Sequence, residues 1–123
     1  MAACSTPPNI AMVTRTVPDA GMRTIFVATN RAFEDQHFTA GRESGVEYAR
    51  FDVSIPPNRD LGEVSWPQGI VPDPSTDFVV TGAGSYSSPG AFRSDIRDAL
   101  QALPPEDREV VVFVHGYNNN FAS

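Results

Sequence analysis

The sequence predicts an α/β fold, because a strand of alternating hydrophobicity, an amphipathic helix and a continuous apolar strand follow one another. The alternating segment is Tyr48–Ile55, the helical segment runs from Ser88 to Leu103, and the apolar run is Val110–Val114. An uninterrupted β-branched run is typical of a parallel strand that is buried on both faces and covered by helices. Because this run lies close to Ser123, few of its neighbours can come from these 123 residues. We therefore expect the front part of a larger α/β domain.

The first half of the chain predicts two strands after a lead-in. Prolines punctuate residues 1–22, and no helical or alternating period emerges there, so we expect an extended, disordered segment. The β-forming run Thr24–Thr29 predicts a strand. The polar stretch Asn30–Glu47 contains two glycines and predicts a loop. Tyr48–Ile55 alternates as a strand with one solvated face does. Its apolar positions are Ala49, Phe51, Val53 and Ile55.

The second half predicts a short strand at Phe78–Thr81, a flexible loop at Gly82–Ser87 and then a helix. Ser88 can accept a hydrogen bond from a free amide, and Pro89 suits the first helical position. One apolar stripe recurs at helical spacing. It consists of Phe92, Ile96, Leu100 and Leu103. Pro104-Pro105 ends the helix, and the apolar run Val110–Val114 follows.

Composition excludes several classes of function. Nine arginines and no lysine stand against fifteen acidic residues, for a net charge of -6. This balance argues against nucleic acid as a partner, and it offers anionic membranes no electrostatic attraction. The single cysteine excludes an intramolecular disulfide and a cysteine-rich zinc site. The acidic pairs Glu34-Asp35 and Asp73/Asp77 lack the ligand spacing of a calcium loop. We expect neither a metal nor a cofactor.

The start of the chain bears on localisation. Met1-Ala2-Ala3-Cys4-Ser5 resembles the end of a bacterial lipoprotein signal, in which small residues precede a cysteine that becomes acylated. If the start codon lies upstream, Cys4 would be a lipid anchor in the cell envelope, and the membrane would be contacted only through it. The alternative is a free cysteine in a loose tail of a cytoplasmic protein.

The strongest candidate for a functional site follows the apolar run. His115-Gly116 comes directly after Val114, and asparagines at 118–120 can begin a second helix. Ligands of open α/β sheets bind at the carboxyl ends of strands. Glycine allows a substrate to approach the backbone, and amides at a helix N-terminus stabilise a developing oxyanion. The alternative is a tight strand-to-helix turn, in which His115 is an ordinary buried hydrogen-bonding residue.

Several motifs in the same order resemble a bacterial, esterase/lipase-like family of unknown function within the α/β-hydrolase superfamily. They are VATNR at Val27–Arg31, YARFDVSIPPNRDLGEVSWP at Tyr48–Pro67, the FVVT strand, and VVVFVHGYNNNF at Val110–Phe121. The resemblance covers the chain from Arg23 to Ser123 and leaves out the first 22 residues. It implies that residues 23–123 are the N-terminal portion of a hydrolase domain.

By this resemblance, the oxyanion loop falls on His115, Gly116 and Tyr117, and the backbone N–H of Tyr117 is the first candidate for the oxyanion donor. His115 would shape the loop and would not be the catalytic base. Asn118 and Asn119 would cap the next helix or contact substrate. The superfamily places its serine in a G-x-S-x-G turn, followed by an acid and a histidine. These 123 residues contain no such motif, so we expect the triad beyond Ser123.

Two hypotheses follow. In the first, the chain is the N-terminal part of a serine hydrolase that acts on small ester-like substrates, and it is inactive on its own. In the second, it is a non-catalytic binding module anchored to the cell envelope. Neither hypothesis fixes the oligomeric state.

Overall fold

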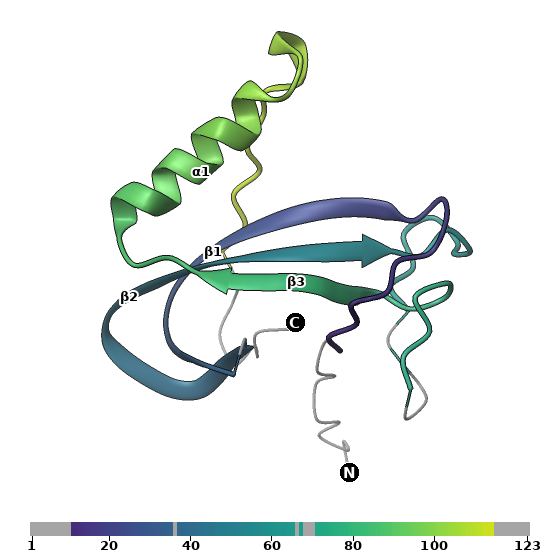
Figure 1. Ribbon diagram of the computed structural model, residues 1–123, viewed down its shortest axis with the longest axis horizontal. Helices are drawn as coiled ribbons and strands as arrows, with labels where there is room; N and C mark the ends of the chain where they lie inside the picture. Colours follow the sequence, from purple (N-terminus) through teal and green to yellow (C-terminus); the bar gives the residue numbers. More distant parts are fainter. Residues whose placement is uncertain (1–10, 36, 66, 68–70, 115–123) are drawn as a thin grey trace.

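The computed structural model describes residues 11–114, apart from residues 36, 66 and 68–70 (Figure 1). Three strands, one α-helix and one short 3-10 helix follow in sequence. They are β1 (Gly21–Glu34), β2 (His37–Ile55), β3 (Val79–Ser85), α1 (Pro89–Gln101) and η1 (Pro105–Asp107). The result is a small mixed α/β domain in which the helix stands at one end of the sheet (Figure 1).

The sheet is an antiparallel meander with the strand order β1-β2-β3. Gly21 pairs with Ile55 at one end of the β1–β2 ladder, and Glu34 pairs with His37 at the other. β3 pairs with β2 from Val79 opposite Ser54 to Ser85 opposite Ala49. β2 is therefore the central strand, and its side chains determine what each face of the sheet can bury.

The loop predicted over Asn30–Glu47 is wrong, because both strands continue through this segment as a long hairpin. The turn is tight, and Asp35 adopts a left-handed backbone with φ of 47°. The ladder shifts register twice between Thr29 and Phe33, which interrupts the period of two that would have indicated a strand. Beyond these shifts Phe33 and Phe38 pack together, with ring centroids 4.9 Å apart.

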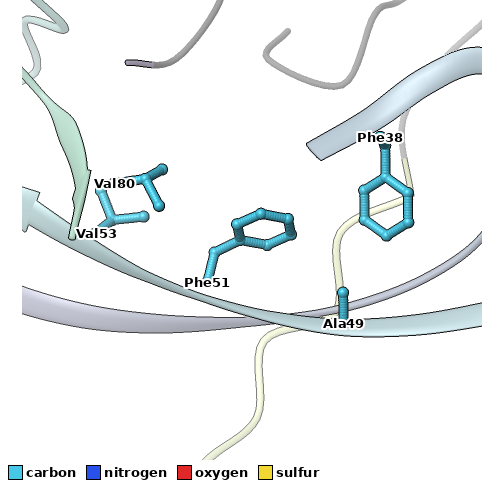
Figure 2. Close-up of a cluster of buried hydrophobic side chains, with 5 residues drawn as sticks. All are labelled: Phe38, Ala49, Phe51, Val53 and Val80. Atoms are coloured by element: carbon cyan, nitrogen blue, oxygen red, sulfur yellow. The ribbon is translucent and has the colours of Figure 1, made fainter. Parts of the chain in front are cut away.

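The core lies on one face of the curved sheet. Five buried side chains form it, namely Phe38, Ala49, Phe51, Val53 and Val80. Figure 2 shows the Phe51 ring between the two valines and Phe38. The predicted inward positions on β2 are confirmed for Ala49, Phe51 and Val53, whereas Ile55 is half-buried. Ser54 alternates with these apolar positions and should therefore lie on the solvated face, but it is fully buried.

The predicted helix is confirmed at its start. Ser88 is the N-cap, its Oγ accepts a hydrogen bond from the Ala91 N–H at 3.1 Å, and Pro89 is the first helical residue. The helix ends at Gln101, two residues before the predicted end at Leu103. The loop predicted over Gly82–Ser87 is wrong for its first four residues, because β3 runs to Ser85.

The strand predicted over Val110–Val114 is not present in the structure, so the coarser α/β class is confirmed and the parallel central strand is not. These side chains are 60% to 90% exposed, and the segment is assigned to no strand. Every strand pairing in the described sheet is antiparallel, apart from an isolated parallel bridge between Met12 and Val80. A parallel central strand needs neighbours on both sides, and the described residues supply none for this run. In the described part of the chain no helix has the length and apolar character needed to span a membrane.

Candidate functional site

The residues that the sequence singled out lie outside the described part of the chain. They are Cys4 and the loop His115, Gly116, Tyr117, Asn118 and Asn119. The structure does describe the segment that leads to this loop, from the N-cap of α1 at Ser88 to Val114. The contacts of this segment with the sheet therefore determine where the loop begins.

α1 is attached to the sheet by its first turn. The Phe92 ring contacts three aromatic rings. Phe26 belongs to β1, Tyr48 belongs to β2, and Tyr86 is the residue that follows β3. The centroid of the Phe92 ring is 4.7 Å from that of Tyr48, 5.4 Å from that of Tyr86 and 6.0 Å from that of Phe26. Edge-on and tilted ring pairs at such distances stabilise a contact beyond the area they bury. Phe92 therefore anchors the helix on the face of the sheet opposite the core.

A polar network lies beside this aromatic group. Asp95 Oδ2 accepts hydrogen bonds from the Tyr86 hydroxyl and from Arg50 NH1, the latter at 3.3 Å. Arg50 also donates through Nε and NH2 to Asp52 Oδ1, at 3.3 and 3.2 Å. Thr24 Oγ1 donates to the same oxygen at 2.8 Å. The network thus links β1, β2 and the end of β3 to α1.

The charge states of the network suit attachment rather than proton transfer. Burial, and then the hydrogen bond to Asp95, raise the pKa of Tyr86 to about 12. The hydrogen bond from Tyr86, together with the Arg50 charge, lowers the pKa of Asp95. Burial opposes the charged form of Arg50, but Asp52 and Asp95 outweigh it and raise its pKa. At neutral pH the group is a phenol, a carboxylate and a guanidinium, and none has a pKa near the value that acid–base catalysis requires.

The other end of α1 is fixed by an arginine from the segment that follows it. Arg108 Nε donates to the Leu103 carbonyl at 3.0 Å, and its NH2 donates to the Gln101 carbonyl at 3.3 Å. The last carbonyls of a helix have no partner within the helix, so the bond to Gln101 satisfies a group that would otherwise depend on water, and the bond to Leu103 holds the chain just beyond the helix. They also hold η1 against the end of α1, and the chain then extends through Val110–Val114.

The acidic positions do not form a metal site within the described residues. No group of three or more histidine, cysteine, aspartate or glutamate side chains there could hold a metal ion. Asp73 Oδ1 accepts bonds from the N–H and hydroxyl of Ser75, at 2.9 and 2.7 Å, and these bonds lower the pKa of Asp73. Asp77 Oδ2 accepts the N–H of Asp73 at 2.8 Å. These carboxylates close a turn.

Sequence reasoning missed the polar network, although a signal for it was present. Asp95 lies between Phe92 and Ile96 on the apolar stripe of the helix, where a carboxylate needs a partner. Arg50 and Asp52 occupy successive outward positions of an alternating strand. A charged residue on an apolar stripe and opposite charges on the outer face of a strand together indicate a contact between the two.

Comparisons of this chain with models of protein families, with curated proteins and with solved structures find no match.

Proposed function

We propose that this chain is the N-terminal part of a serine hydrolase of the α/β-hydrolase type, which acts on a small ester-like substrate. The observation that carries the proposal is the sequence VVVFVHGYNNNF, in which His-Gly follows an apolar β-forming run at once. The run is preceded by a strand and a capped helix, β3 and α1. A strand, a helix and an apolar run in succession form the connection that parallel strands require.

In this proposal Val110–Val114 is the parallel central strand of the intact domain, with further strands beside it. The five apolar side chains are 60% to 90% exposed in this structure. Their burial against neighbouring strands would be favoured by the hydrophobic effect, which supports this placement. The anchored first turn of α1 and the bonds of Arg108 at its end would set where the run begins.

The chemistry assigned to this chain is electrostatic. The backbone N–H of Tyr117 would donate a hydrogen bond to the oxyanion that forms when a serine attacks the ester carbonyl. His115 and Gly116 would shape the loop and allow the substrate to approach it. These 123 residues contain no G-x-S-x-G motif, so the nucleophile, the acid and the catalytic histidine would come from beyond Ser123.

The first test is to translate the coding DNA beyond Ser123 in all frames. A further strand that runs into G-x-S-x-G supports the proposal, and its absence refutes it. The second test is labelling with a fluorophosphonate probe, which reacts with activated serines. The 123-residue chain should not be labelled, and the extended chain should be. Labelling of the 123-residue chain would show that the nucleophile had been assigned to the wrong part of the protein.

The role of the Tyr117 N–H can be tested separately in the extended chain. Tyr117→Pro removes the donor, and loss of one oxyanion donor lowers kcat by about 10²–10³-fold. Tyr117→Phe keeps the backbone N–H and should retain wild-type kcat. Equal losses in the two variants would show that the side chain, not the amide, matters there.

The alternative proposal is a non-catalytic binding module anchored through Cys4. One observation favours it: the five buried core residues all belong to β2 and β3, so the core does not depend on Val110–Val114. This proposal requires a cooperative thermal transition of the 123-residue chain and an acylated Cys4 in membranes from the source cell. Mass spectrometry of the mature N-terminus tests the latter directly.

A further inference from the structure

The apolar run Val110–Val114 combines three properties that make a segment pair with another strand. Four of its five residues are valine and the fifth is phenylalanine, and none is charged. β-branched and aromatic residues favour the extended, half-buried backbone of a sheet. Each side chain is between 60% and 90% exposed, and no residue of the described chain pairs with this backbone.

The outer edge of β3 offers a matching position. Near its start the edge already takes a segment in parallel: the Val13 N–H donates to the Val80 carbonyl at 2.8 Å, and the Val80 N–H donates to the Ala11 carbonyl at 2.9 Å. From Thr81 to Ser85 the described residues supply no partner on this side. That stretch has five residues, the same number as the apolar run.

The direction of the backbone groups supports this assignment. The Tyr86 N–H donates to the Tyr48 carbonyl on β2 at 2.9 Å. Successive amides of a strand point to opposite sides, so the Ser85 N–H points outward, away from β2. An outward N–H on an edge strand is the group that an added strand uses.

The two edges of the sheet differ in how they resist such an addition. β1 carries charged side chains along its length, among them Arg23, Arg31 and Glu34, and charges on an edge strand oppose pairing because they would lose water. Thr81–Ser85 has no charge and consists of small residues, TGAGS. A Cβ added at Gly84 would meet nothing within 4 Å. A Cβ added at Gly82 would lie 3.2 Å from Asp52 Oδ2, so the free space along this stretch is at Gly84.

We propose that this chain self-associates, with Val110–Val114 of one copy adding as a strand to the Thr81–Ser85 edge of a second copy. Three observations favour this occupant. The edge continues from the stretch of β3 that pairs with Ala11–Val13, the two segments each have five residues, and neither segment carries a charge. The proposal concerns the 123-residue chain, whose Val110–Val114 run is exposed; in the extended hydrolase proposed above, further strands of the same copy would cover this run.

Sedimentation velocity over a wide range of concentration tests the proposal on the 123-residue chain. Val112→Lys places a charge in the strand that would be added, and the dissociation constant should rise about tenfold or more. Ser85→Pro removes the outward N–H, and Ser85→Lys puts a charge on the same edge, so each should weaken association similarly. Leu61→Lys is the matched control, because Leu61 is 97% exposed in a loop and lies in neither segment.

Hydrogen exchange distinguishes the occupants of the edge. Protection of the amides in Thr81–Ser85 and Val110–Val114 should rise together as the protein concentration rises. Four results would overturn the proposal. They are a monomer at every concentration, an unchanged dissociation constant in both Ser85 variants, equal weakening by Leu61→Lys, and protection that does not depend on concentration. The last would indicate that the run docks on its own copy.

Discussion

Replacement of Phe92 by alanine should release α1 from the sheet while the sheet stays folded. Phe92 makes the three ring contacts that hold the helix, and the polar network beside it consists of partly exposed groups that water screens. A 13-residue helix is marginal in water without tertiary packing, so a released α1 should unfold.

The magnitude follows from the burial of the ring. Full truncation of a buried phenylalanine costs about 3–5 kcal/mol, and Phe92 is half-buried, so we expect about 2 kcal/mol. That free energy corresponds to a factor of about 30 in the equilibrium between docked and released helix. Amide exchange in α1 should therefore accelerate about 30-fold in Phe92→Ala, while the amides of β2 keep their protection.

Hydrogen exchange measured residue by residue by NMR is the assay, and Arg93→Ala is its control. Arg93 is the next residue of the helix and is exposed, so its truncation should leave the protection of α1 close to that of the wild type. Two results would refute the reasoning. One is unchanged exchange in α1 of Phe92→Ala, and the other is an equal loss of protection in β2 and α1.

Three further changes probe the same attachment. Because the pKa of Asp95 is lowered in the folded state, its contribution is present above the ordinary carboxyl value of 3.8 and is lost as the pH falls through the folded pKa. Far-UV circular dichroism should show this acid loss of helix, and Asp95→Asn should abolish it. The raised pKa of Tyr86 works in the other direction: stability is full below the ordinary phenol value of 10.0 and falls as the pH rises toward about 12. Absorbance titration should show a late phenol step that is missing in Tyr86→Phe. Ser88→Ala removes the N-cap and should reduce the stability of α1 by about 1 kcal/mol, measured as faster exchange of the Ala91 amide.

The sequence predicted elements whose signals are local. The alternation of Tyr48–Ile55 placed Ala49, Phe51 and Val53 on the buried face, because a pleated strand turns every second side chain to the same side. Ser88-Pro89 located the start of α1 to the residue, because capping depends on only a few neighbouring amides.

The long hairpin could not be predicted from the same signals. Its distal part is polar, contains Gly41 and Gly45, and shifts register twice, so the sequence shows neither alternation nor continuity. What makes it a hairpin is the pairing of β1 with β2 over its whole length and the packing of Phe33 against Phe38 and Phe51. Those contacts become apparent only when the two strands are aligned.

Val110–Val114 shows the opposite error. Its composition favours a buried strand. Burial requires a neighbouring strand, however, and the sequence of the run does not determine which strand that is. The residues of the candidate site, His115–Asn119, lie past this run and outside the described residues. The hydrolase assignment therefore stays a prediction from sequence. The network around Asp95 was within reach of sequence reasoning, through a carboxylate on an apolar stripe.

The connectivity of the sheet has a consequence for synthesis. The strands pair in the order in which they are made, β1 with β2 and β2 with β3, so each pairing closes a local segment of chain. Local pairings form quickly, and domains fold from the N-terminus as the ribosome releases them. The sheet and its core can be complete once Ser85 has emerged, before α1 itself has left the ribosome. Val110–Val114 emerges after α1, when the sheet and its Thr81–Ser85 edge can already be folded.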